Sequence, residues 1–217
     1  MCNRYGPTPP SLLPERWRVR EPQVTWLPGP VFPRAQGLFI RAAEAEDNDL
    51  VTGQWGLIPW FAKAAKLSYS TNNARFEGIA GKASFKQPWL RGQRCIIPAD
   101  WFDEPCWETG RNVWWRFRRA DGQPGGLAGR WARWADPASG ELLESYTMLT
   151  LNADAHPLMS RMHKPDPKLP ADQQDKRSVV PIAPADVDTW LRGNTHDAAS
   201  LVQLCPADQF ISEPVGA

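Results

Sequence analysis

The sequence lacks the cysteine spacings of a zinc site or of a disulfide-rich domain. It contains four cysteines in 217 residues, at positions 2, 95, 106 and 205, and no two of them form a CxxC pair. Structural zinc sites need closely spaced ligands, and small secreted domains carry a much denser set of cysteines. We therefore expect reduced thiols, no metal site and no cofactor.

Long apolar runs and an excess of one charge are also missing. No apolar run approaches the roughly 18 residues needed to span a bilayer, and the first residues show no basic segment followed by an apolar one. The 25 Lys and Arg residues offset 24 Asp and Glu residues to a net charge of +1. Charge alone therefore does not indicate a nucleic-acid partner, although it is compatible with a local basic groove. We expect a soluble cytoplasmic protein with no membrane contact.

Tryptophan and proline, in contrast, are abundant, with 12 and 22 residues respectively. Proline interrupts regular elements, so the first fifty residues, which contain PTPPSLLPERW and LPGPVFP, predict an irregular segment with at most short strands. A chain of this length with 42% hydrophobic residues suits one globular domain over residues 1–217.

The remaining pattern is dominated by strands. Segments rich in β-branched or aromatic residues predict strands over residues 51–58, 94–102, 112–118, 126–134 and 145–153. Capping residues predict helices over residues 71–85 and 183–193. The polar, proline-rich residues 163–177 predict a long surface loop, and the tail 193–217 is ambiguous. The pattern favours an α+β fold: a mostly antiparallel, barrel-like sheet with a few flanking helices and long proline-rich loops.

Cys2 is the first candidate for chemistry. If Met1 is removed, Cys2 carries two nucleophiles, a free α-amine and a thiol, on one short spacer. An α-amine with an ordinary pKa of about 8 is partly neutral at cytosolic pH and can attack an aldehyde to give a Schiff base. The thiol can then add to the imine and close a thiazolidine. The alternative is that Cys2 is a small buried hydrophobe without a chemical role.

Polar residues later in the chain could serve such a site. Asn73 and Arg75 lie at the start of a predicted helix, where an amide can orient an amine and a guanidinium can bind phosphate. The alternative is a plain helix cap with a solvated arginine. Asp103 and Glu104 follow an aromatic pair, where partial burial would raise a carboxyl pKa toward the range of a general acid or base. The alternative is a pair of solvated acids in a turn.

The three histidines are His156, His163 and His196. His163 follows a predicted strand and lies between basic residues, His156 precedes a proline, and His196 lies in the ambiguous tail. Each is also compatible with a simple loop hydrogen bond.

Five sequence blocks occur in a recognisable order. They are MCNRY, WGLIPWFAK from Trp55, NARFEGIAGKASFK from Asn73, RCIIPADWFDE from Arg94 and LTLNADAHPLMSRMH from Leu149. Together they resemble the SOS-response-associated peptidase family, abasic-site sensors that crosslink to single-stranded DNA. The resemblance covers about residues 1–192. It implies binding of single-stranded DNA that contains abasic sites and a covalent shield on the lesion in the DNA damage response. We expect a monomer that is nucleoid-associated when bound to DNA.

The resemblance also implies roles for individual residues. Cys2, exposed by self-cleavage of the initiator methionine, would form a thiazolidine with the ring-opened aldehyde of the abasic sugar. Asn73 would lie near the cysteine, and Arg75 would contact DNA phosphate. Glu104 would transfer protons during ring opening, ring closure and self-cleavage. His163 would help to open the sugar, and a lyase activity on the strand is compatible with this chemistry.

The sequence departs from the family pattern in several places. Asn3 and Trp101 replace glycines, and Pro105 stands where a tryptophan usually follows the glutamate. After His163 the chain carries an insertion of about residues 164–176. The competing alignment puts Met159 in place of the family histidine, with residues 160–162 as the match, and leaves no family histidine. The five-residue step from Leu158 to His163 favours the insertion.

The resemblance and the residue types suggest a DNA-binding groove. The phosphate contacts would be Arg4, Arg75, Lys86 and either Arg161 or Arg177. The stacking surfaces would be Trp55, Trp60 and Trp101. Two other functions remain as alternatives: an N-terminal-nucleophile cysteine peptidase that acts on other polypeptides, and a non-covalent single-strand DNA-binding protein.

Overall fold

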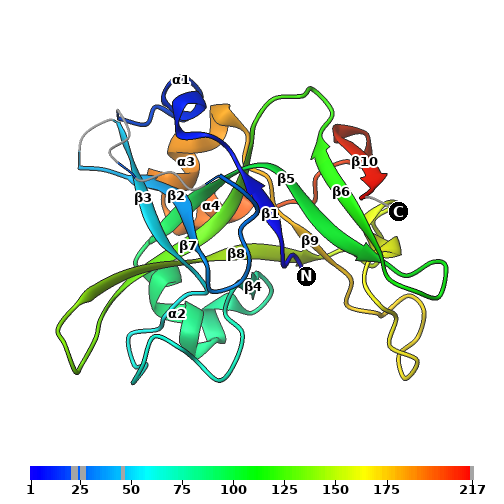
Figure 1. The fold of residues 1–217 in the computed structure, drawn as a ribbon, viewed down its shortest axis with the longest axis horizontal. Helices are drawn as coiled ribbons and strands as arrows, with labels where there is room; N and C mark the ends of the chain where they lie inside the picture. The colour runs from blue at the N-terminus through cyan, green and yellow to red at the C-terminus, as the bar shows by residue number, and fades with distance from the viewer. Residues whose placement is uncertain (21–23, 25–27, 45–46, 216–217) are drawn as a thin grey trace.

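The computed structural model describes residues 1–20, 24, 28–44 and 47–215. Its strands are β1 (Tyr5–Pro7), β2 (Gln36–Ala42), β3 (Asn48–Trp55), β4 (Asn73–Arg75), β5 (Arg94–Cys106), β6 (Val113–Arg119), β7 (Gly125–Ala135), β8 (Leu142–Asn152), β9 (Arg177–Val179) and β10 (Phe210–Pro214). Its α-helices are α1 (Leu13–Trp17), α2 (Ala83–Leu90), α3 (Val187–Arg192) and α4 (Thr195–Ser200). Figure 1 shows α1 and α2 on opposite sides of the strands. Within the described part of the chain, no helix is long and apolar enough to span a bilayer.

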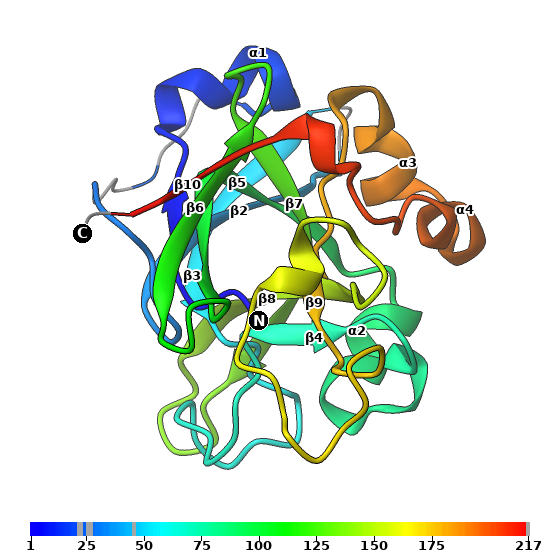
Figure 2. The same cartoon turned by 90° about the vertical axis from the view of Figure 1, so that its right-hand side faces the viewer.

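Five of the strands close into a barrel. β5 pairs with β2 and with β7, β2 pairs with β3, β3 with β8, and β8 with β7, so the hydrogen bonding returns to β5. Only the β3–β8 pair in this ring is parallel. β1 and β6 extend the sheet from β5, and β4 and β9 extend it from β8 (Figure 2). The predicted α+β fold with a mostly antiparallel, barrel-like sheet is therefore confirmed.

The core has two parts because β5 is buried on both faces. Successive side chains on a strand point to opposite faces. Cys95 and Ile97 join a cluster with side chains from all five barrel strands, whereas Ile96 joins a second cluster with the helices. The barrel cluster also includes Tyr5, whose ring packs edge-to-face on Trp55 with a centroid separation of 5.1 Å. The N-terminal segment is thus part of the barrel core.

The five predicted strands correspond to β3, β5, β6, β7 and β8, and the predicted helix over residues 183–193 contains α3. The helix predicted over residues 71–85 is wrong. Residues Asn73–Arg75 form β4, which pairs in parallel with β8, and the α-helix begins only at Ala83. Pairing with β8 supplies backbone hydrogen bonds that the local pattern of capping residues did not reveal.

The two ends of the chain contain more structure than the sequence predicted. The first fifty residues include the seven-residue strand β2, although residues 21–23, 25–27 and 45–46 of that segment lie outside the described part. The ambiguous tail contains α4 and β10, and β10 pairs with β6. Residues 164–176 contain no helix or strand, as expected of a long loop. The Gln174 side chain holds this loop by donating to the carbonyls of Leu169 and Pro170, at 2.9 and 2.8 Å.

Candidate active site

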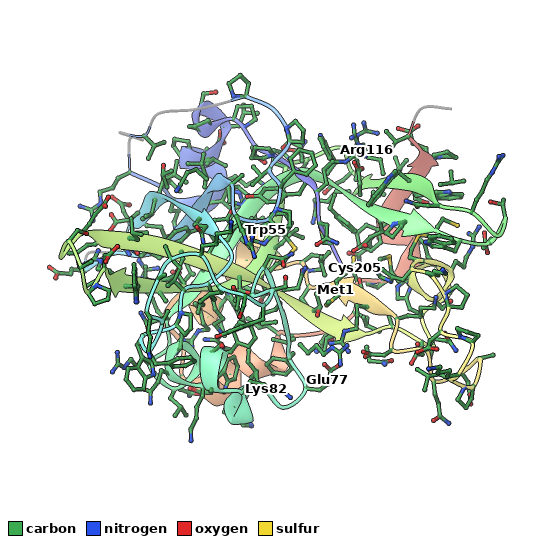
Figure 3. The ribbon with its side chains drawn as sticks, turned by 60° about the horizontal axis from the view of Figure 1, so that its bottom comes forward. Met1, Trp55, Glu77, Lys82, Arg116 and Cys205 are labelled. Atoms are coloured by element: carbon green, nitrogen blue, oxygen red, sulfur yellow. The ribbon has the colours of Figure 1, made fainter. Side chains whose placement is uncertain are left out.

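The N-terminal segment enters the middle of the molecule. In Figure 3, Met1 lies near the centre, and β1 pairs with β5 through Tyr5 and Phe102. Burial of the Tyr5 ring stabilises this position by roughly 1.5–3 kcal/mol, as is typical for a large side chain. Cys2 is therefore 0% exposed, and its Sγ lies 3.5 Å from the Arg4 carbonyl oxygen.

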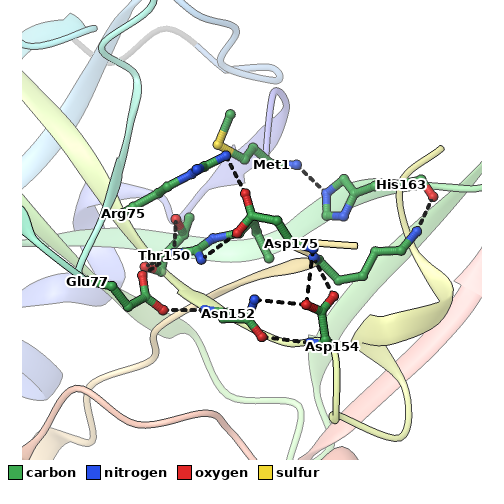
Figure 4. Close-up of polar contacts among 10 residues, drawn as sticks. Met1, Arg75, Glu77, Thr150, Asn152, Asp154, His163 and Asp175 are labelled. Atoms are coloured by element: carbon green, nitrogen blue, oxygen red, sulfur yellow. Dashed lines mark hydrogen bonds and ion pairs between the residues drawn. The ribbon is translucent and has the colours of Figure 1, made fainter. Parts of the chain in front are cut away.

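Three titratable groups meet at the start of the chain. The carboxylate of Glu104, on β5, lies 2.9 Å from Nε2 of His163 and 3.7 Å from the Met1 ammonium. The ammonium also contacts Nε2 of His163 (Figure 4). Nε2 cannot accept a proton from the ammonium and donate one to the carboxylate at once. It therefore makes one of these two hydrogen bonds at a time.

The backbone around His163 fixes the position of its ring. His163 has a φ of 63°, in the left-handed region, and its N–H donates to the Pro105 carbonyl at 2.6 Å. The Lys176 ammonium donates to the carbonyls of Met162 and His163, at 2.7 Å each. Pro105 directly follows Glu104, so these bonds hold the imidazole against the carboxylate. Lys176 is a buried functional candidate that the sequence did not reveal. It is the last residue of the predicted insertion, which the sequence presents as a surface loop.

The electrostatics differ between the carboxylate and the thiol. Burial would raise the pKa of Glu104, but the Met1 ammonium and His163 more than offset it, so the pKa lies below its usual range. For Glu104, the prediction of a raised carboxyl pKa is therefore wrong, because it considered burial without these partners. Burial, reinforced by the Glu104 carboxylate, raises the pKa of the Cys2 thiol well above its ordinary value. The site therefore combines an ionised carboxylate with a protonated thiol.

Strand β4 brings Asn73 and Arg75 to the same site. The Asn73 amide donates to the Cys2 carbonyl at 2.7 Å, and its Oδ1 is buried without a hydrogen-bond partner. Arg75 lies two positions along the strand, on the same face, and its side chain is 55% exposed in an ion pair with Asp175 (Figure 4). Oε1 of Glu104 is also buried without a partner. The site therefore contains two buried acceptor oxygens without a hydrogen-bond donor.

The other predicted DNA contacts lie in different settings. Arg4 donates to Asp103 at 2.6 Å, on the opposite face of β5 from Glu104. Arg161 makes two bonds of 2.7 Å with Glu108. Trp101 is half-buried beneath the Arg116 guanidinium, whose carbon lies 3.4 Å from the ring centroid. Each of these arginines has a carboxylate partner, with which DNA phosphate would compete.

Two predicted contacts are buried and one lies away from the site. Trp55 is 0% exposed and donates its indole N–H to the Asn72 carbonyl at 2.8 Å, so it offers no surface to a base in this structure. Arg177 is buried against Glu77 and the Thr150 carbonyl, where it fixes β9 to β8. Lys86 is exposed on α2, and Figures 1 and 2 both show β4 between this helix and the N-terminus.

The remaining histidines have other surroundings. His156 is buried, accepts at Nδ1 from the N–H groups of Leu158 and Met159, and contacts the Cys205 carbonyl through Nε2 at 2.8 Å. It therefore stabilises the turn that precedes His163. His196 is exposed on α4. Among the described residues, no group of three or more His, Cys, Asp or Glu side chains could hold a metal ion.

Curated relatives align with part of the chain. Abasic site processing protein YoqW of Bacillus subtilis (strain 168) is 31% identical over 150 residues, which are 68% of this chain and 64% of the relative. Abasic site processing protein HMCES of Xenopus tropicalis is 29% identical over 137 residues, which are 53% of this chain and 40% of the relative. The chain thus spans less than two thirds of the length of these relatives.

The similarity to solved structures extends over the whole chain. An X-ray structure of a Bordetella bronchiseptica protein matches with a TM-score of 0.88 and 34% identity, over 100% of both chains. A Bacteroides thetaiotaomicron protein shares the fold, with a TM-score of 0.80 at 19% identity, over 99% of this chain and 92% of that one. The sequence profile of the SOS response associated peptidase (SRAP) family matches residues 1–217. The chain belongs to the SOS response associated peptidase family.

Proposed function

We propose that this protein binds single-stranded DNA and forms a thiazolidine crosslink between Cys2 and an abasic site. The observation that carries the proposal is the convergence of Glu104, His163 and Asn73 on the N-terminal residues. Aldehyde capture by an amine and a thiol requires proton transfer at each step, and a carboxylate with a hydrogen-bonded imidazole supplies it. The names of the aligned abasic site processing proteins agree with this substrate class.

The first step is removal of Met1. Its ammonium occupies the contacts with Glu104 and His163 that a substrate would need. Hydrolysis of the Met1–Cys2 peptide bond consumes one water and leaves a free α-amine on Cys2. We assign Glu104 and His163 to proton transfer in this self-cleavage. The reaction creates the second nucleophile, the α-amine of Cys2. It also removes the Met1 ammonium from its contacts with Glu104 and His163.

Crosslinking then proceeds in two additions. The neutral Cys2 amine attacks the aldehyde carbon of the ring-opened sugar, and loss of water gives an imine. The thiol adds across the C=N bond, so that sulfur bonds to carbon and the proton passes to nitrogen. While Met1 is present, burial raises the pKa of the Cys2 thiol, so the thiol stays protonated until the amine is released. Glu104 accepts and returns protons, and Asn73 orients the residue through its carbonyl.

The DNA strand would follow exposed cationic and aromatic side chains. Arg75 is the best-placed phosphate ligand, because it is exposed and lies two residues after Asn73. Arg4 and Arg161 add guanidinium groups with further donors beyond those bound to carboxylates. Trp60 is 69% exposed and packs edge-to-face on Phe61, so it offers a stacking surface that the buried Trp55 does not. Binding should weaken steeply with salt.

The decisive experiment incubates the purified protein with single-stranded DNA that carries one abasic site and measures denaturation-resistant adduct. Wild type should form the adduct, and Cys2→Ala should not. Mass spectrometry of the intact protein should show that the active form lacks Met1. Absence of a wild-type adduct, or an undiminished one from Cys2→Ala, contradicts the proposal. Cys2-dependent cleavage of an added peptide without DNA would support a peptidase instead, and equal affinity for intact and abasic strands without adduct would support a non-covalent binder.

A further inference from the structure

The side chains of Asn3 and Asn72 form an amide pair beside the reactive residue. Nδ2 of Asn72 lies 3.1 Å from Oδ1 of Asn3 and 3.3 Å from the Cys2 carbonyl oxygen. The Asn73 amide donates to the same carbonyl at 2.7 Å. The Cys2 carbonyl therefore accepts from two amide groups. The roles assigned above use only Asn73.

Asn72 is held rigidly from its other sides. Its side chain is buried, and Oδ1 accepts from the Ser70 hydroxyl. Its backbone carbonyl accepts from the Trp55 indole at 2.8 Å and from the Met148 N–H at 2.9 Å. An amide fixed by this many bonds has a defined donor direction, which points at Cys2 and Asn3.

After Met1 is lost, Cys2 must be held in place by other residues. We call the side chains of Asn72 and Asn3 the clamp. Once the Met1–Cys2 bond is cleaved, Cys2 is a chain end, and chain ends fray unless they are tied down. Of the bonds described for Cys2, the two that its carbonyl accepts do not involve the reacting amine or thiol. They can therefore persist while those groups react.

We propose that Asn72, together with Asn3, is a positioning residue that holds the Cys2 carbonyl so that the amine and thiol face Glu104 and His163. The inference rests on the proposed crosslinking function. It also gives a role to Asn3, which stands where the resembling family has glycine. Asn3 is not among the residues with positive φ, so its backbone does not need a glycine, and its side chain supplies the acceptor for Asn72.

The test compares variants in their mature form, after mass spectrometry has shown that Met1 is absent. Asn72→Asp keeps the shape of the side chain and its acceptor oxygen but removes the amide donor. Asn3→Gly removes the Oδ1 that accepts from Asn72. Asn112→Asp, the same change at an exposed position before β6, is the matched control. The readouts are the maximal crosslinking rate at saturating abasic DNA, the half-saturating DNA concentration and the thermal midpoint.

A clamp should affect the rate and leave DNA binding unchanged. Because each hydrogen bond contributes a modest net free energy, we expect the maximal rate to fall about threefold for Asn3→Gly and about tenfold or more for Asn72→Asp. Half-saturation should stay within about twofold, since one or two hydrogen bonds that do not touch DNA are lost. Adding Asn3→Gly to Asn72→Asp should slow the reaction no further, because the two residues act through one contact.

The outcomes separate this inference from the function on which it rests. A wild-type adduct with an unchanged maximal rate in Asn72→Asp overturns the clamp and leaves the crosslinking function intact. An absent wild-type adduct overturns both. If Asn72→Asp does not fold, the exposed Asn3→Gly variant decides, and an unchanged maximal rate there overturns the clamp.

Discussion

Replacement of Glu104 by glutamine tests the centre of the proposed mechanism. The buried Glu104 carboxylate lies 2.9 Å from Nε2 of His163, and glutamine keeps its size and one acceptor oxygen while removing the charge and the proton affinity. A positioned general acid or base contributes about 10²- to 10⁴-fold to a rate. We therefore expect Glu104→Gln to slow crosslinking at neutral pH by a factor in this range.

The same variant should change the pH dependence of stability. The pKa of Glu104 is lowered in the folded protein, because the Met1 ammonium and His163 outweigh the effect of burial. A carboxyl group with a lowered folded pKa stabilises the fold above its unfolded pKa, about 4.3, and this contribution disappears as pH falls through the folded pKa. With Met1 retained, the difference in unfolding free energy between wild type and Glu104→Gln should be full near neutrality and vanish in acid.

The assay must separate chemistry from processing, because Glu104 is also assigned to removal of Met1. Both proteins should be treated with a methionine aminopeptidase and checked by intact mass before single-turnover crosslinking is measured. Glu213→Gln, the same change on the exposed side of β10, is the matched control and should react at the wild-type rate. A mature Glu104→Gln protein that crosslinks as fast as wild type refutes the assignment of proton transfer to Glu104.

Three further variants address the histidines and the DNA surface. His163→Ala should slow crosslinking or its reversal with little loss of stability. His156→Ala should leave the crosslinking rate nearly unchanged but lower the thermal midpoint, since His156 bonds to three backbone groups. A rate loss confined to His156→Ala would reverse these roles. Asp175→Asn removes the carboxylate paired with Arg75. It should tighten binding of intact single-stranded DNA severalfold, as measured by fluorescence anisotropy at low salt. Unchanged or weaker binding would show that phosphate does not compete with Asp175 for Arg75. Trp60→Ala should weaken the same binding by about 1–3 kcal/mol if a base stacks on the indole, and an unchanged Kd would exclude such stacking.

Local sequence predicts a strand correctly where strand-forming residues continue over many positions. The long strands β5, β7 and β8 were predicted because β-branched and aromatic residues continue between clear turn signals. The capping residues predict a helix where the structure has β4, because a three-residue strand carries too little periodicity to outweigh them. The β8 residues with which it pairs in parallel are distant in sequence, since Asn73 pairs with Met148.

The sequence by itself determined the candidate site residues: Cys2 with its potential second nucleophile, and Asn73, Glu104 and His163 as its polar partners. Only the tertiary structure decided which side chains have access to a substrate and what holds the reactive ones. It buries Trp55 and Arg177, places Lys176 behind His163 and directs Asn72 at the Cys2 carbonyl. The physical reason is that accessibility, pKa and hydrogen-bond direction depend on groups that are distant in sequence, whereas chemical identity belongs to each residue alone.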